Sequence, residues 1–394
     1  MSSDEQAAPR HLPVLDGIRG VAILLVVLFH TAVIAPDTIA DIAYLFGASC
    51  GFAGVDLFFV LSGLLITGIL LDAKGSPTYL RSFYARRALR TLPLYYAILT
   101  LALFVLPRFV PADKAARFGS VTGDAAYYWL HLSNVAVARA HAFRHPVLDI
   151  SWSLAIEEQF YLVWPLVVLA CSRRALVKVS AGAIGAALAI RMVMVLVLHR
   201  DPHETYVLTP CRMDALAVGA LLAALAREPG GLVAKRRAAV ATAAIAGPLA
   251  LAAILVDFLP TGAIVLPGSV WPLATFGLSL IAITFGALLV LALTAPPESA
   301  LARALRSRVL RTFGKYAYGI YLVHVPARAV IRDRIFGPGW SEARWKFPVI
   351  LGSELGGQIV FDVICAALAL VLAAISYHLF EERFLALKKR FPMR

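Results

Sequence analysis

Ten runs of apolar residues, each long enough to cross a lipid bilayer, follow one another along the chain. They cover residues 14–34, 50–72, 83–107, 152–171, 175–198, 209–227, 236–256, 270–295, 312–334 and 358–382. A helix needs roughly 20 apolar residues to span the hydrocarbon core. Only 15% of the residues are charged, against about 25% in a soluble domain. The sequence therefore predicts an all-α, polytopic transmembrane helical bundle of about ten spans.

Basic residues occur in alternate gaps between these runs. The gap after the second run and the first residues of the third run contain Lys74, Arg81, Arg86 and Arg87, whereas the gap after the first run contains no Lys or Arg. Because positive charge gathers on the cytoplasmic side, both termini are predicted to be cytoplasmic. We expect residues 1–12 to form an N-terminal tail and residues 383–394 a basic C-terminal tail.

The same distribution of charge bears on domain organisation and on partners. The net charge is +13, but the basic residues sit in the gaps and form no stripe with interleaved aromatic residues, so no nucleic-acid partner is expected. No internal repeat divides the chain, and residues 1–394 are predicted to form a single membrane domain. The aromatic segment Asp124–Asn134 is too short to span and suits a membrane interface.

The first run contains Arg19 near its start and His30 towards its end, and both residues are ionisable. Eleven residues make about three helical turns and rise roughly 16 Å, so the two side chains share one face of a helix. In the simpler interpretation, Arg19 extends to the interface and His30 forms a hydrogen bond inside the bundle. Ionisable groups inside spans are usually functional or paired, and the shared face favours a common channel.

Asp56 begins the second run and is predicted to lie at the depth of His30. A carboxylate beside an imidazole fixes its tautomer and raises its basicity, as general-base catalysis requires. Alternatively, Asp56 only caps the start of its helix. The sequence predicts His30 as a base and Asp56 as the residue that orients it.

Arg87 and Arg90 lie three residues apart and therefore on one face of the third helix. They are either ordinary cytoplasmic charges or, with Arg19, a phosphate site, since guanidinium groups suit phosphates. Glu157 and Glu158 are adjacent and point about 100° apart, so only one of them is expected to face the bundle. The apolar surroundings favour Glu158.

Four other ionisable or polar residues are weaker candidates for site residues. Arg212 and Asp214 are most simply an internal ion pair at the start of the sixth run. Tyr321 and His324 lie in the ninth run, where a lone histidine is more often structural. No metal site is expected, because the histidines and the four cysteines lack ligand spacing.

Several segments occur in a fixed order along nearly the whole chain. They are HLPVLDGIRG at 11–20, GVDLFFVLSGLLIT at 54–67, RRALRTLPLYY at 86–96, SWSLAIEEQFYLVWP at 151–165, CRMDALAVGALLA at 211–223 and YGIYLVHVP at 318–326. Each is weak alone. Together with the ten residues between Arg19 and His30, they make the chain resemble the acyltransferase 3 family of integral membrane acyltransferases.

The resemblance implies transfer of an acyl group, commonly acetyl, from cytosolic acyl-CoA to a hydroxyl or amine. Acceptors in the family include surface polysaccharides, lipid-linked sugars and macrolides. His30 matches the essential base of the family, and Arg19, Arg87 and Arg90 match arginines thought to serve the CoA donor. Many relatives carry an added C-terminal hydrolase-like domain. We expect this chain to be the stand-alone form, located in the plasma (inner) membrane.

The predicted function is therefore acyl transfer to a hydroxyl of a sugar-containing acceptor, with acyl-CoA as donor substrate and no bound cofactor. An acyl-enzyme route through Ser62 has less support, because Ser62 is flanked by Gly63 as at a packing position. A transporter or flippase is the alternative, since intramembrane charges suit that class too. The missing repeat argues against it. A purely structural membrane protein would tolerate loss of His30 and Arg90.

Overall fold

The computed structural model describes residues 13–35, 37–109, 119, 121–264, 266–336, 347, 349 and 352–393. Within these ranges the long elements are all helices. They are α1 (Pro13–Thr31), α3 (Gly54–Ala73), α4 (Tyr79–Thr100), α8 (Trp152–Ala170), α9 (Arg173–Met192), α11 (Thr209–Leu225), α12 (Arg236–Phe258), α13 (Leu278–Leu293), α15 (Arg308–Phe336) and α16 (Leu355–Ser376). The predicted N-terminal tail, 1–12, lies outside the described residues.

Shorter helices connect the long ones or cover their ends. They are α2 (Ile39–Ser49), α6 (Ala125–Trp129), α7 (Ser133–Ala140), α10 (Pro202–Val207), α14 (Ala300–Leu305) and α17 (Glu382–Ala386). The segment predicted to be interfacial folds as α6 and the start of α7, joined by a turn. Both helices are too short to span a membrane.

Among the described residues, nine helical segments are long and apolar enough to cross a membrane. They coincide with every predicted run except 312–334. That run forms α15, which is 29 residues long but includes Lys315, Arg328 and Arg332, so its composition is more polar than that of the others. The predicted all-α polytopic bundle is confirmed, and the protein is a multi-pass membrane protein.

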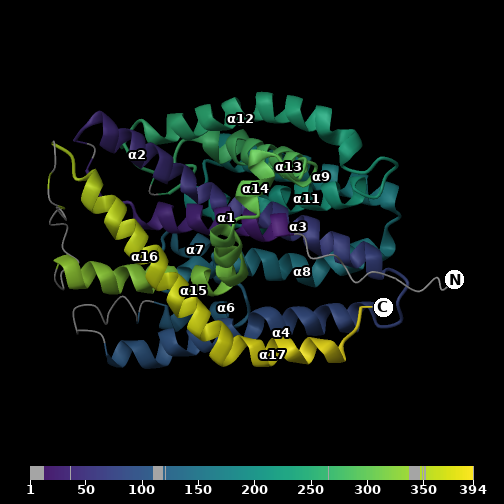
Figure 1. The fold of residues 1–394 in the computed structure, drawn as a ribbon, viewed down its shortest axis with the longest axis horizontal. Coiled ribbons are helices and arrows are strands. Elements are labelled where there is room, and N and C mark those ends of the chain that lie inside the picture. The colour runs from purple at the N-terminus through teal and green to yellow at the C-terminus, as the bar shows by residue number, and fades with distance from the viewer. Residues whose placement is uncertain are drawn as a thin grey trace.

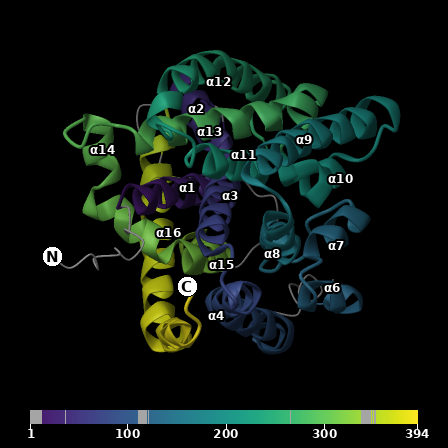
Figure 2. The same ribbon diagram turned by 90° about the vertical axis from the view of Figure 1, so that its right-hand side faces the viewer.

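Helices α1 and α3 lie in the middle of the bundle, with α12 towards one edge and α4 towards the opposite edge (Figures 1 and 2). Of the residues in the most apolar stretch of the α11 segment, 72% are buried inside the structure, whereas the corresponding share in the α9 segment is 17%. Helix α11 is therefore central and α9 is peripheral. Peripheral helices expose large apolar side chains, such as Val197, Leu249 and Val363. An apolar surface of this kind faces lipid in a membrane protein.

Glycines allow α1 and α15 to approach each other closely. A Cβ atom added to Gly20 would lie 2.0 Å from the carbonyl oxygen of Leu310, and one added to Gly314 would lie 1.8 Å from that of Asp16. Gly314 also lies beside the backbone nitrogen of Gly20. Small residues at a crossing let backbones meet in this way. The two helices run parallel, and this crossing determines their register.

Replacing Gly20 by leucine is therefore expected to abolish accumulation of folded protein, because a side chain there must push α1 away from α15. Gly185→Leu is the matched control, since nothing lies within 4 Å of a Cβ at Gly185 on the peripheral helix α9. The yield of monodisperse protein after detergent extraction measures the difference. Equal yields for the two variants would contradict this account of the α1–α15 contact.

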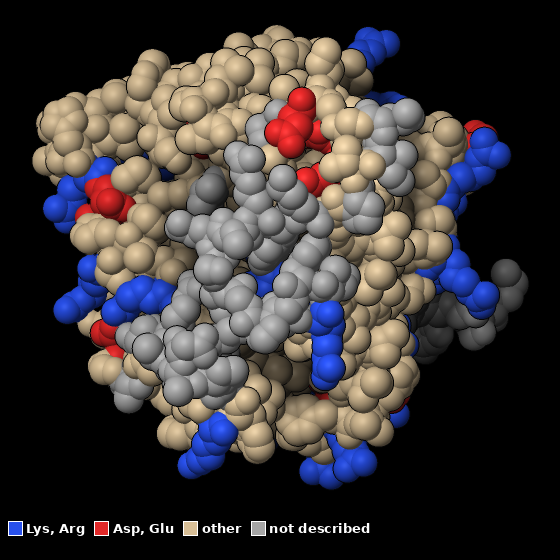
Figure 3. All heavy atoms as spheres, turned by 90° about the vertical axis from the view of Figure 1, so that its left-hand side faces the viewer, with Lys and Arg blue, Asp and Glu red and all other residues tan. Residues whose placement is uncertain are grey.

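The start of α1 and the end of α17 lie towards the same end of the bundle, on the right in Figure 1. The predicted C-terminal tail continues beyond α17 and packs against α4, where Arg86 Nη1 donates to the carbonyls of Lys388 and Phe391 at 3.2 and 3.3 Å. At the opposite end, basic and acidic side chains occur near one another on the visible surface (Figure 3). The cytoplasmic location of both termini stays a prediction.

Candidate active site

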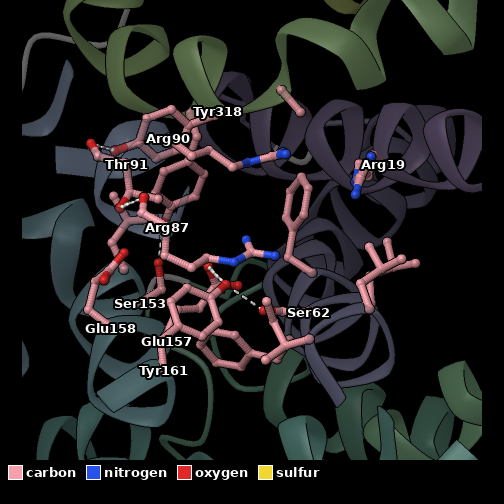
Figure 4. A pocket seen from close by; sticks show the side chains of 18 of the residues that line it. Arg19, Ser62, Arg87, Arg90, Thr91, Ser153, Glu157, Glu158, Tyr161 and Tyr318 are labelled. Carbon is pink, nitrogen blue, oxygen red and sulfur yellow. Dashed lines mark hydrogen bonds between the residues drawn. The ribbon is translucent and has the colours of Figure 1, made fainter. Parts of the chain in front are cut away.

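A cavity of about 210 Å³ lies between α1, α3, α4, α8 and α15. Phe58, Leu65 and Ile69 recur at helical spacing along the face of α3 that lines the cavity. Ser62 is the polar residue on this otherwise apolar wall. The polar side chains come mainly from α4 and α8 (Figure 4). The cavity therefore has an apolar wall and charged groups inside a membrane bundle, where a charged side chain is costly unless it has a function or a partner.

The three predicted donor-site arginines all line this cavity. Arg19 comes from α1 and donates from Nη1 to Asp16 Oδ1 at 3.0 Å. Arg87 and Arg90 come from α4, and the Arg87 guanidinium lies 5.2 Å from the centre of the Tyr161 ring. Such a stack holds the guanidinium in place. Three guanidinium groups facing one cavity create a positive potential suited to an anion.

Glu157 and Glu158 both line the cavity (Figure 4). The expectation that only one of them faces the bundle is therefore wrong, because the cavity extends over a wide sector of α8. Tyr161 OH donates to Glu157 Oε2 at 3.0 Å and lies 2.6 Å from Ser62 Oγ. Since the tyrosine proton is directed to the carboxylate, the Ser62 hydroxyl donates to Tyr161. Ser62 thus belongs to a hydrogen-bonded chain on the cavity wall.

The cavity continues along α15 through Tyr318 to Tyr321. Tyr321 OH donates to the carbonyl of Ile150 at 2.9 Å and lies 2.6 Å from Ser153 Oγ. One helical turn further on, His324 contacts His30 of α1, with 3.3 Å between His324 Nε2 and His30 Nδ1. Tyr321 therefore connects the cavity to the two histidines, which are not part of its lining.

Asp56 does not orient His30, and that prediction is wrong. Asp56 Oδ1 instead accepts from Arg212 Nη2 at 2.8 Å, and both side chains are almost completely buried. The rings of Phe59, Trp152 and Tyr206 surround the guanidinium, at 5.0 to 5.9 Å from their centres. A buried arginine requires a carboxylate partner, and Asp56 supplies it.

Asp214 likewise pairs with a residue outside its own helix. Arg191 Nη2 of α9 donates to Asp214 Oδ2 at 2.8 Å, and Ser279 Oγ of α13 donates to the same oxygen at 2.7 Å. The predicted pair of Arg212 with Asp214 is wrong, because residues two apart on a helix point in different directions. Each forms an ion pair with a different helix, and together the two pairs connect α11 to α3 and α9.

Sequence reasoning missed several residues that the fold brings into or near this region. Arg191 lies inside the run 175–198, so a charge within a span was the available signal. Lys315 and Tyr318 line the cavity from α15. His131 lines it from the turn between α6 and α7, where its backbone φ is 53°.

His131 stacks on Tyr95, with 4.3 Å between the ring centres. Burial lowers the pKa of His131 to about 4, so this imidazole is neutral at physiological pH. It adds a polar but uncharged group to the cavity wall. No feature of the sequence around it pointed to a left-handed turn at a histidine.

The chain resembles known proteins along most of its length. The acyltransferase domain family, acyltransferase 3, matches residues 12–378. The peptidoglycan O-acetyltransferase OatA of Listeria monocytogenes is 30% identical over 80% of this chain and 49% of its own length. The putative peptidoglycan O-acetyltransferase YrhL of Bacillus subtilis is 30% identical over 95% of this chain and 55% of its own.

The O-acetyltransferase OatA of Staphylococcus aureus is 28% identical over 82% of this chain and 51% of its own length. The chain thus spans about half the length of these curated relatives. No solved structure matches it. The match over 12–378, together with the membrane bundle and its charged cavity, shows that this chain belongs to the acyltransferase 3 family of membrane acyltransferases.

Proposed function

We propose that this protein is an O-acyltransferase that moves an acyl group, most simply acetyl, from cytosolic acyl-CoA to a hydroxyl of a sugar-containing acceptor. A surface polysaccharide, a lipid-linked glycan or a macrolide-type natural product would provide such a hydroxyl. The observation that carries the proposal is the cavity in which Arg19, Arg87 and Arg90 meet. The names of the relatives support acetyl as the group and a glycan as the acceptor class.

The donor would bind by its phosphates to the three arginines. Coenzyme A carries several phosphate groups, and guanidinium groups bind phosphates through paired, charge-assisted hydrogen bonds. Arg19 lies eleven residues, roughly 16 Å along α1, from His30. A donor anchored at the arginines would extend its thioester along the cavity towards Tyr321 and the histidines. The apolar face of α3 would contact the uncharged arm.

The acceptor would approach from the other end of this path. His30 would remove the proton from the acceptor hydroxyl as it attacks the thioester carbonyl, the step that general-base catalysis accelerates. Glu158 on the cavity wall would accept hydrogen bonds from further acceptor hydroxyls and hold the acceptor in place. We propose direct transfer, because the hydrogen of the Ser62 hydroxyl is directed to Tyr161. The protein would work in the plasma (inner) membrane.

The direct test uses purified protein in lipid vesicles, acetyl-CoA and a panel of acceptors that includes glycans, lipid-linked sugars and macrolides. Release of free CoA thiol together with an acetylated acceptor is the expected result. Movement of an acceptor across the vesicle membrane without CoA release would instead support a transporter or flippase. Absence of acetyl transfer to every member of the panel would count against the proposed function.

Replacing Arg90 by glutamine is expected to raise the KM for acetyl-CoA about tenfold or more, because a hydrogen bond to a charged group contributes roughly 1.5–3 kcal/mol. Arg237→Gln is the control, since Arg237 is exposed on α12 away from the cavity. Initial rates against acetyl-CoA concentration measure both variants. An unchanged KM for Arg90→Gln would contradict the assignment of this arginine to the donor.

A further inference from the structure

Two imidazoles meet inside the bundle although their positions differ by 294 residues in the sequence. Nε2 of His324 lies 3.3 Å from Nδ1 of His30, and the ring centres are 4.9 Å apart. His324 is 2% exposed, whereas His30 is only partly buried. His324 on α15 is therefore the enclosed partner in this contact, and His30 on α1 is the more accessible one.

The surrounding carbonyl groups define which nitrogens carry hydrogen. Nδ1 of His324 lies 2.7 Å from the carbonyl oxygen of Tyr321 and 3.2 Å from that of Ile320. Carbonyl oxygens only accept hydrogen bonds, so this Nδ1 is the donor. In a neutral imidazole the other nitrogen then has a free lone pair. Nε2 of His324 is consequently an acceptor, and it faces His30.

The same reasoning applies to His30. Its Nδ1 lies 2.8 Å from the carbonyl oxygen of Val26, so this nitrogen also carries a hydrogen. The hydrogen is shared between the Val26 carbonyl and Nε2 of His324. Nε2 of His30 therefore has the lone pair, and it makes no hydrogen bond to any described residue. A base in this tautomer is ready to take a proton from a bound hydroxyl.

The fold brings the two rings together through the glycine crossing described above. Gly20 and Gly314 are in contact, and α1 and α15 run parallel from there. His30 follows Gly20 by ten residues, and His324 follows Gly314 by ten residues. Equal helical lengths rise equally, by about 15 Å. The register that the glycines set therefore places both imidazoles at one height.

We propose that His324 is the positioning residue that accepts the Nδ1 hydrogen of His30 and keeps Nε2 of His30 as the base; this rests on the proposed function. His324 thus does what a carboxylate does for histidine in many hydrolases, and what Asp56 was predicted to do. Because His324 is neutral, it orients His30 without placing a negative charge in the bundle, where charge is costly.

The transfer step balances with these groups alone. The acceptor hydroxyl proton moves to Nε2 of His30 while the acceptor oxygen forms a bond to the thioester carbonyl carbon. The carbon–sulfur bond then breaks, and the departing thiolate takes the proton from Nε2. Arg328 follows His324 by four residues and so lies one turn further along the same face of α15, where its positive charge repels a second positive charge on the imidazoles. That repulsion assists return of the proton to the thiolate.

Two substitutions at His324 separate positioning from packing. His324→Met fills the space without a good acceptor, whereas His324→Gln can place its amide oxygen where Nε2 lies. His30 becomes positively charged when it takes the acceptor proton, and a hydrogen bond to a charged group contributes about 10- to 100-fold. We therefore expect His324→Met to lower kcat by about that factor, with the KM for acetyl-CoA unchanged. His324→Gln should recover most of this loss. Equal losses in the two variants, or a loss confined to KM, would overturn the proposal.

A double variant provides a second kinetic readout. In a His30→Ala background, His324→Met should cause no further decrease in kcat, because residues that act as a unit are not additive. A further loss as large as the one in the wild-type background would show that His324 acts independently of His30. Thermal unfolding of each variant identifies any that fails to fold, and His324→Gln then decides the outcome.

A measurement without turnover distinguishes this inference from the proposed function. In ¹⁵N-histidine-labelled protein in lipid nanodiscs, NMR reports the tautomer of each imidazole, and loss of signals in His30→Ala and His324→Met assigns them. We expect both residues with hydrogen on Nδ1, and a changed His30 signal in His324→Met. Hydrogen on Nε2 of His30, or an unchanged His30 signal, would refute the pairing even if acyl transfer is found. Confirmed pairing without any acyl transfer would count against the proposed function alone.

Discussion

Replacing His30 by alanine is expected to lower kcat about 10²–10⁴-fold, the contribution that a positioned general base typically makes. The KM for acetyl-CoA should change little, because the donor phosphates are assigned to Arg19, Arg87 and Arg90. Protein yield and thermal unfolding should stay near those of the wild type, since the His30 side chain is only partly buried. Rates of CoA release with saturating acceptor measure the effect.

A second histidine provides the control for this substitution. His199 is exposed, and its backbone φ is 47°, a conformation that asparagine tolerates. His199→Asn therefore removes an imidazole without affecting the bundle, and wild-type kinetics are expected. Near-wild-type turnover in His30→Ala would exclude His30 as the base. It would also direct attention to the hydrogen-bonded chain of Ser62, Tyr161 and Glu157.

Replacing Asp56 by alanine is expected to destabilise the protein by about 3–5 kcal/mol, the usual effect of removing one partner of a buried ion pair. Arg212 would be left 1% exposed without its carboxylate. Among the described residues, Arg212 Nε and Nη1 have no hydrogen-bond partner, so the loss of Asp56 would also remove the bond that Nη2 makes. A large decrease in the thermal unfolding temperature in detergent is the expected observation.

The exposed pair of Arg227 with Asp72 is a matched control. Asp72 has a side chain that is 71% exposed, and such pairs contribute about 0–1 kcal/mol. Asp72→Ala should therefore leave the unfolding temperature almost unchanged. Replacing both members of the buried pair, as Asp56→Leu with Arg212→Met, should recover much of the stability that Asp56→Ala loses. A shift in Asp56→Ala as small as that in Asp72→Ala would contradict the account.

The amino-acid sequence by itself determined the class of fold. Apolar runs of spanning length leave the chain no alternative to helices in lipid, because unpaired backbone groups are too costly there. In the part of the chain that the structure describes, the runs coincide with nine spanning segments and with α15. Helical spacing alone also placed Arg87 and Arg90 on one face, and Arg19 on the face of His30.

Only the tertiary structure decided which side chains are partners. Hydropathy and helical spacing describe one helix at a time, whereas contacts between helices depend on rotation, tilt and register. Asp56 was therefore assigned to His30, although rotation of α3 directs it to Arg212. Asp214 was assigned to Arg212, and Arg191 on α9 was overlooked.

The contact between His30 and His324 is the clearest case in which the sequence shows the residues and only the packing shows that they are partners. Each histidine was visible in the sequence as an ionisable residue in an apolar run. Their contact depends on Gly20 and Gly314, which let α1 and α15 approach in one register. A glycine is informative only when its neighbour is known, because its effect is to permit close approach of another backbone. The sequence thus specified the polar groups, and the packing of parallel helices determined how they are combined.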